Sequence, residues 1–196
     1  NLLFKAADSG VKAIANTVIN SAHKKLRCRV IDKTDSANPI VGCSSDTFAV
    51  RPAMFSGAIN GFLAGEQKSA TPANTIFAKS SDNTTNAQGY NAVLDKTSIL
   101  GATFYPPSVI CASDTTDKLI DNIAVSFADG VSSSIDAKFK DIGVFDLNLT
   151  DSTWTLGDEC IAGSSSNMQV GGKYGCDIGG NVKASAGVYQ MSVEPI

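Results

Sequence analysis

The chain has 196 residues, of which 43% are hydrophobic and 18% charged, with a formal net charge of −3. Folded proteins have about 45–50% apolar and about 25% charged residues, so this composition predicts a globular chain and excludes a disordered one. The small negative charge gives no reason to expect nucleic acid or an anionic membrane as a partner. No apolar run approaches the roughly 18–20 residues that a membrane span needs, so membrane insertion is not expected. The length allows one large β domain or two domains of about 80–100 residues each.

Residues 1–25 give the least clear pattern. Apolar residues recur at three- and four-residue spacings between Val11 and Ala22, as in a helix, but the β-branched Thr17 and Val18 favour an extended chain. We expect extended structure because every later segment has a β pattern. The chain starts at Asn1 and stops directly after a strand-like run, so we expect a piece of a larger protein.

A β-hairpin is predicted next. Residues 26–32 alternate in polarity, residues 33–39 form a polar turn, and residues 40–43 return. Cys28 and Cys43 would lie near the open end of this hairpin. Their separation of fifteen residues predicts a disulfide that closes it.

A second cysteine pair spans a segment rich in glycine and serine. Cys160 and Cys176 lie sixteen residues apart within residues 157–180. Disulfides that close loops of this length stabilise by roughly 3 kcal/mol each and imply an oxidising compartment. The alternative, a metal site, lacks C-x-x-C spacing and has only His23 to help. The fifth cysteine, Cys111, is either a buried thiol or pairs in a different connectivity, and spacing leaves both open.

The segment 43–55 divides the chain. Phe48 and Val50 alternate with Ala49 and Arg51, which predicts a strand, and the proline that follows at 52 ends it because proline cannot donate to a ladder. The predicted organisation has three parts: an N-terminal segment with the hairpin at 1–47, a first β-sandwich module at 48–110 and a second at 111–196.

Both predicted modules contain strand patterns separated by turn signals. These patterns lie at 75–79, 90–94, 98–104, 123–127, 134–139, 144–149 and 182–193. Strands that recur about every 8–12 residues are typical of β-sandwiches, and no long helices alternate with them, which excludes a parallel α/β sheet. The prediction is therefore an all-β protein of antiparallel, immunoglobulin-like β-sandwiches.

Several stretches together resemble a known family. The Cys-Ser-Ser-Asp-x-Phe-Ala-Val-Arg-Pro run at 43–52 is similar to the marker of the MshQ-like domain family, named after a protein of mannose-sensitive haemagglutinin pilus biogenesis. Softer similarity at 64–65, 89–91, 141–145 and 151–155 extends the resemblance over roughly 28–160, although residues 140–143 depart from the usual pattern. The resemblance implies a bacterial surface or pilus-associated protein with immunoglobulin-like β modules, and it supplies no catalytic motif.

Catalytic patterns are weak. A Ser–His–acid triad would need His23, which is followed directly by two lysines, and no G-x-S-x-G elbow occurs. The glycines at 171–180 lack the spacing of a phosphate loop. Glu66 and Glu159 offer carboxylates for glycoside hydrolysis, with Trp154 as a sugar platform, but no spacing requires it. We therefore predict that the chain is not an enzyme.

Two kinds of ligand site are candidates. Trp154 is either a core residue between sheets or a stacking surface, and with Tyr174 in the 160–176 loop it is a candidate ligand contact. Aspartates in polar loops offer hard oxygen ligands to calcium, although none follows the EF-hand pattern and such residues commonly cap turns. The calcium candidates are Asp32, Asp35, Asp114 and Asp117, with a further pair at Asp82-Asn83. No other cofactor is expected.

The sequence favours a non-enzymatic structural or adhesion module at the cell surface, whose partner is a protein or glycan on another surface. The alternative is the repeating subunit of an extracellular filament, in which residues 1–22 add a strand to the next copy. A glycan-active hydrolase is a third, weaker hypothesis.

Overall fold

The structure is a computed structural model, which describes residues 5, 8, 18–62, 68–69, 75–104, 120–139, 143–156 and 158–186. Most of the predicted N-terminal extended segment lies outside these residues. So do Cys111, Asp114 and Asp117, and the end of the last predicted strand. Apart from short 3-10 segments, the regular secondary structure of the described part consists of β-strands, which confirms the all-β prediction.

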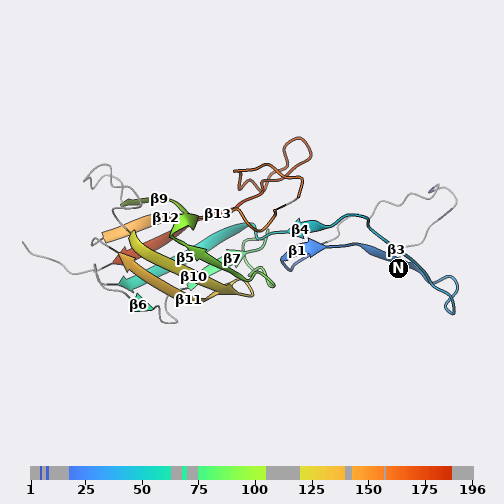
Figure 1. Cartoon of the computed structure of the whole chain (residues 1–196), viewed down its shortest axis with the longest axis horizontal. Helices are drawn as coiled ribbons and strands as arrows, with labels where there is room; N and C mark the ends of the chain where they lie inside the picture. The colour runs from blue at the N-terminus through green and yellow to red at the C-terminus, as the bar shows by residue number, and fades with distance from the viewer. Residues whose placement is uncertain are drawn as a thin grey trace, which may run out of the picture.

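Nine of the described strands form a single sheet (Figure 1). They are β5 (Met54–Phe62), β6 (Lys68–Ser69), β7 (Thr75–Lys79), β8 (Ala92–Asp95), β9 (Ile99–Phe104), β10 (Ile120–Ala128), β11 (Val131–Phe139), β12 (Gly143–Asp151) and β13 (Ile178–Ala186). The order is β8-β10-β11-β7-β5-β13-β12-β9, with β6 on β11. Its two ends, β8 and β9, are joined only by the 3-10 turn η2 (Lys96–Ser98), so the sheet must curl to bring its ends together.

This topology corrects two expectations. Strands of the predicted modules 48–110 and 111–196 alternate within one sheet, so the modules do not have separate sheets. The sheet is also not wholly antiparallel, because β5 and β13 pair in parallel, with Gly179 opposite Met54 and Lys183 opposite Ala58. Pairing between strands more than 100 residues apart leaves no local signal in the sequence.

Four further strands lie outside the sheet. β1 (His23–Leu26) pairs with β4 (Phe48–Val50), and β2 (Arg29–Asp32) pairs with β3 (Ile40–Cys43). In Figure 1 these strands extend away from the nine-stranded sheet as an arm, with β4 leading back to it. The β2–β3 hairpin is the one predicted from the alternation at 26–43.

The predicted disulfide at this hairpin is wrong. Cys28 and Cys43 are exposed free thiols. In the hairpin register Arg29 lies opposite Cys43, and both the N–H and the C=O of Cys28 bond Ser44 instead. Directly opposed residues share a face and successive residues alternate, so the two thiols are one residue out of register and point to opposite faces.

The core lies inside the curled sheet and is centred on four aromatic rings. Tyr90 contacts Phe55, Phe127 and Trp154, with ring centroids 5.9, 5.3 and 4.8 Å away. All four residues are buried. The β10–β11 hairpin that carries Phe127 turns at Asp129-Gly130, where both residues have positive φ, as a two-residue turn of type I′ requires.

β5 is the central strand that sequence reasoning missed. It carries the buried Phe55 and Ile59, but Gly57 between them interrupts the apolar alternation. Gly57 has φ of 131°, and a side chain there would meet the backbone of Thr75 in β7. The glycine that hides the strand pattern is therefore what allows β5 and β7 to approach.

Candidate functional site

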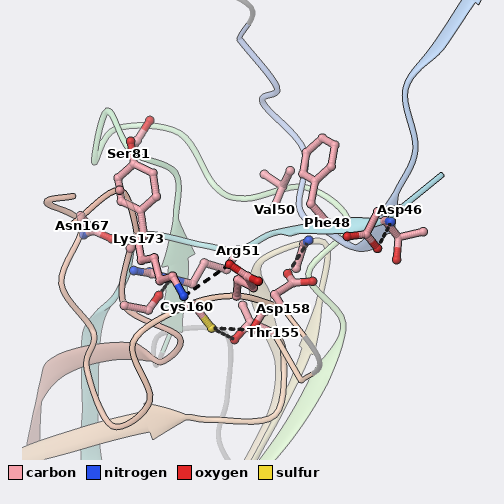
Figure 2. Close-up of a pocket in the computed structure, with 16 residues that line it drawn as sticks. Asp46, Phe48, Val50, Arg51, Ser81, Thr155, Asp158, Cys160, Asn167 and Lys173 are labelled. Carbon is pink, nitrogen blue, oxygen red and sulfur yellow. Dashed lines mark hydrogen bonds and ion pairs between the residues drawn. The ribbon is translucent and has the colours of Figure 1, made fainter. Parts of the chain in front are cut away.

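A groove of about 770 Å³ lies between β4 and the 158–176 loop (Figure 2). Its volume falls within the roughly 300–1,000 Å³ of pockets for small ligands. Phe48 and Val50 point to the same side of β4, as alternation in a strand requires. The 158–176 loop supplies the opposite wall, including Lys173 and Tyr174.

Arg51 joins the two walls. Its Nε donates to the carbonyl of Gly175 at 2.8 Å and its Nη2 to that of Ser166 at 2.9 Å, both in the loop. Its Nη1 donates to the carbonyl of Pro52 at 2.9 Å. Burial lowers the pKa of Arg51, and the charge of Asp177 raises it in return. A planar guanidinium with several fixed donors suits this task, since lysine lacks the fork.

The second predicted disulfide is confirmed and closes the loop. Cys160 and Cys176 are bonded, with their Cα atoms 5.1 Å apart. Backbone hydrogen bonds continue the closure, because Ile161 N–H donates to Tyr174 O at 2.8 Å and Cys176 N–H to Ile161 O at 3.0 Å. The loop wall of the groove is therefore held both covalently and by Arg51.

Side chains bond two backbone groups of β4. The carboxylate of Asp158 accepts the N–H of Ala49 at 2.6 Å, and the indole N–H of Trp154 donates to the carbonyl of Val50 at 3.1 Å. β1 pairs with β4, with Leu26 opposite Phe48. This pairing and the two side-chain bonds occupy much of the hydrogen-bonding capacity of this short strand.

Of the two predicted ligand contacts, one is buried and one is exposed. Trp154 is only 4% exposed and stacks against Tyr90, with Lys24 Nζ 4.9 Å from its ring centre. It is a core residue, so its burial does not support the predicted stacking role. Tyr174 is 53% exposed and lines the groove, together with the partly exposed Phe48.

Two aspartates of the described part, Asp151 and Asp177, are buried. Asp151 accepts the hydroxyl of Tyr90 at 2.8 Å, and burial together with the charge of Asp151 raises the pKa of Tyr90. Asp177, which is 8% exposed, directly follows the disulfide. Burial raises the pKa of Asp177 more than the charge of Arg51 lowers it, and Asp151 adds to the increase.

We expect Asp177→Asn to raise the melting temperature by a few degrees at pH 7 but not near pH 4. Because the pKa of Asp177 is raised on folding, its contribution to stability is fully present below the unfolded pKa of about 3.9 and is lost as pH rises through the folded pKa. Asparagine resembles the protonated, neutral form of Asp177 at every pH, so the variant does not lose this stability as the pH rises. Thermal melts of both proteins between pH 4 and 7 measure the difference.

Glu159→Gln is the matched control, since this carboxylate is exposed. Its melting temperature should follow that of the unmodified protein across the range. A melting temperature of Asp177→Asn below that of the unmodified protein at pH 7 would show that attraction to Arg51 outweighs the burial of the charge.

The predicted calcium ligands in the arm serve as turn caps. Asp32 accepts the N–H and the hydroxyl of Thr34 at 2.8 and 2.6 Å, and these bonds lower the pKa of Asp32. Asp35 accepts from Asn38 and Ala37, with the same effect on its pKa. Within the described ranges no three metal-binding side chains gather, so these residues give the calcium prediction no support.

Sequence reasoning selected the segment 43–55 but not the roles of Arg51 and Asp158. Arg51 was predicted only as a strand residue on the same face as Ala49, whereas it anchors a loop more than 100 residues away. The sequence feature that could have indicated this role is the position of Arg51 at the end of a predicted strand, between an apolar alternation and Pro52. No sequence feature pointed to Asp158.

Comparisons of the chain with protein-family models, with curated proteins and with solved structures find no match. None of the helices in the described residues is long and apolar enough to cross a membrane.

Proposed function

We propose that the chain is a non-enzymatic adhesion or structural module of a larger bacterial surface or pilus-associated protein, and that the groove beside β4 holds its ligand. The observation that carries this proposal is the groove itself. Its two walls come from distant parts of the chain and are held together by Arg51 and by the Cys160–Cys176 disulfide. A preformed groove binds without the entropic cost of ordering its walls.

The cellular setting is part of the same proposal. A disulfide persists in oxidising compartments, so the Cys160–Cys176 bond supports an extracellular or cell-surface location. The resemblance of residues 43–52 to the MshQ-like family supports the same setting, and in the structure this run forms β4 and one groove wall. The immunoglobulin-like β-sandwich stays a prediction.

Tyr174→Ala is expected to weaken adhesion about tenfold without lowering the melting temperature. Exposed tyrosines in binding sites contribute large contact areas at small entropic cost, and truncation of one commonly costs more than 1 kcal/mol of binding. Since half of the side chain is exposed, stability should change by less than about 0.5 kcal/mol. Beads coated with the protein and allowed to settle on mucin or on matrix proteins measure adhesion.

Met168→Ala is the matched control, because this residue is exposed in the same loop but does not line the groove. If the two variants adhere equally well, Tyr174 does not contact the ligand, and the proposal that the groove holds the ligand is wrong.

A second candidate function is self-association into a filament, which the exposed apolar residues of the arm favour. Val30, Ile31, Ile40 and Val41 are all exposed, although two of them lie on each face of the hairpin. Val18 and Ile19 are exposed as well, and Ser21, two residues after Ile19, forms a β-bridge with Gln88. We therefore keep strand addition through residues 1–22 as a second proposal. It predicts that the protein self-associates and that the associated fraction rises with protein concentration.

A further inference from the structure

We propose that the groove recognises a glycan whose hexose units carry hydroxyl or amino groups and no carboxylate. This inference rests on the proposed function, because it names the ligand class of the same groove. It follows from three properties of the groove: backbone groups of β4 that are already hydrogen-bonded, carboxylate oxygens that can accept hydrogen bonds, and exposed rings at the walls.

A peptide that adds a strand to β4 does not fit. Such recognition needs free backbone N–H and C=O groups along an edge. Here β1 pairs with β4, and Asp158 and Trp154 bond the N–H of Ala49 and the C=O of Val50. Recognition in this groove must therefore come from side chains.

The side chains that line the groove are rich in acceptors. Asp46 accepts the N–H of Thr47 through Oδ1, and Asp158 accepts that of Ala49 through Oδ2. No hydrogen bond from a described residue reaches Oδ2 of Asp46 or Oδ1 of Asp158, so each carboxylate keeps an oxygen for a ligand. Ionised carboxylates only accept, which selects ligands that donate, such as sugar hydroxyl and ammonium groups.

The cations of the groove already have partners. Lys173 Nζ lies 3.3 Å from a carboxylate oxygen of Glu159, which also lines the groove, and Arg51 donates to backbone carbonyls and feels the charge of Asp177. A uronate or sialate would therefore bring its own carboxylate to Asp46 and Asp158 without a free counter-charge. Like-charge contacts of this kind exclude wrong ligands.

Exposed rings complete the site. Phe48 and Tyr174 line the groove from opposite walls and both expose part of their rings. A hexose presents an apolar C–H face and a polar rim, so its face can cover a ring while its rim donates to the carboxylates. The disulfide and Arg51 hold both walls, so the site is preorganised for this pairing.

The test is titration calorimetry of the whole chain with three short oligosaccharides: oligomers of glucosamine, of glucose and of galacturonic acid. We expect affinity to fall in that order, with the galacturonate oligomer at least tenfold weaker than the glucosamine oligomer. Asp46→Lys should reduce the affinity for the glucosamine oligomer at least tenfold, and added salt should reduce it further.

Asp95→Lys is the matched control. The carboxylate of Asp95 also accepts a nearby backbone N–H, that of Thr97. Asp95 does not line the groove, so the substitution makes the same change of charge away from it. It should bind the glucosamine oligomer as the unmodified protein does. Equal affinities for the three oligomers, preference for galacturonate, equal effects of the two lysine variants, or no binding at all would each overturn the inference. If adhesion still depends on Tyr174 in that case, the proposed function stands and only the ligand class is wrong.

Discussion

Replacement of Gly180 by alanine is expected to lower the melting temperature by roughly 8–16 °C, which corresponds to a loss of at least about 4 kcal/mol. Gly180 lies in β13, where a Cβ atom would press on the backbone of Phe55 in β5, including its nitrogen at 2.7 Å. Backbone cannot move aside as a flexible side chain can, so the strands must separate.

The consequences reach beyond one contact. The parallel pair β5–β13 is the only link in the sheet order between β8-β10-β11-β7-β5 and β13-β12-β9 among the described strands. Phe55 also packs against Tyr90 and Phe127 in the core. Displacement of β5 therefore disturbs both the sheet and the aromatic cluster.

Gly42→Ala is the control for this experiment. Gly42 lies in β3, and a Cβ atom there would have nothing within 4 Å. Differential scanning calorimetry should give this variant the melting temperature of the unmodified protein. A cooperative transition of Gly180→Ala within two degrees or so of that temperature would show that β5 and β13 are not held as closely as described.

Arg51→Met is expected to cost about 3 kcal/mol of stability, or roughly 6–12 °C in melting temperature, and to open the groove. The substitution keeps apolar volume but removes the donors to Gly175, Ser166 and Pro52. Hydrogen bonds from charged donors contribute about 1.5–3 kcal/mol each, and Asp177 would remain buried without its counter-charge.

The loop should respond more strongly than the sheet. Because the disulfide still joins Cys160 to Cys176, the ends of the loop stay together while its middle loses its anchor. We expect amide hydrogens of 164–175 to exchange faster in Arg51→Met, with little change in β10 and β11. Hydrogen exchange followed by mass spectrometry measures both regions in one experiment.

Arg27→Met is the matched control, since Arg27 is exposed in the arm and should change stability by less than about 0.5 kcal/mol. Arg51→Lys should lie between the two, because lysine keeps the charge but loses the fork. If Arg51→Met exchanges and melts like Arg27→Met, then the loop is held by its disulfide and its own hydrogen bonds alone.

The local features of the fold were predictable because they depend on neighbouring residues. The strand at 75–79 was located to the residue, and the turn at Asp129-Gly130 has the sequence that a type I′ turn requires. Alternation also located β10, β11 and β12 to within a few residues. β5 was not predicted because Gly57 interrupts its alternation, and this glycine is needed so that the backbone of Thr75 in the neighbouring strand β7 can approach.

The candidate site was predictable only in part. Tyr174 and the disulfide loop were identified from composition and from cysteine spacing, which report on a segment that closes on itself. Trp154 belongs to the core, and Arg51 and Asp158 act across more than 100 residues. Such contacts depend on which strands become neighbours, and that is a property of the whole sheet.

The sequence by itself determined the β class, most strands and the Cys160–Cys176 bond, because polarity alternation, turn residues and short loops are local. Only the tertiary structure decided the single curled sheet, the parallel β5–β13 pair and the groove. It also decided the fate of Cys28 and Cys43, since a register that differs by one residue reverses the face on which a side chain lies. Spacing along a chain limits which atoms can meet, and the pairing of strands selects which of them do.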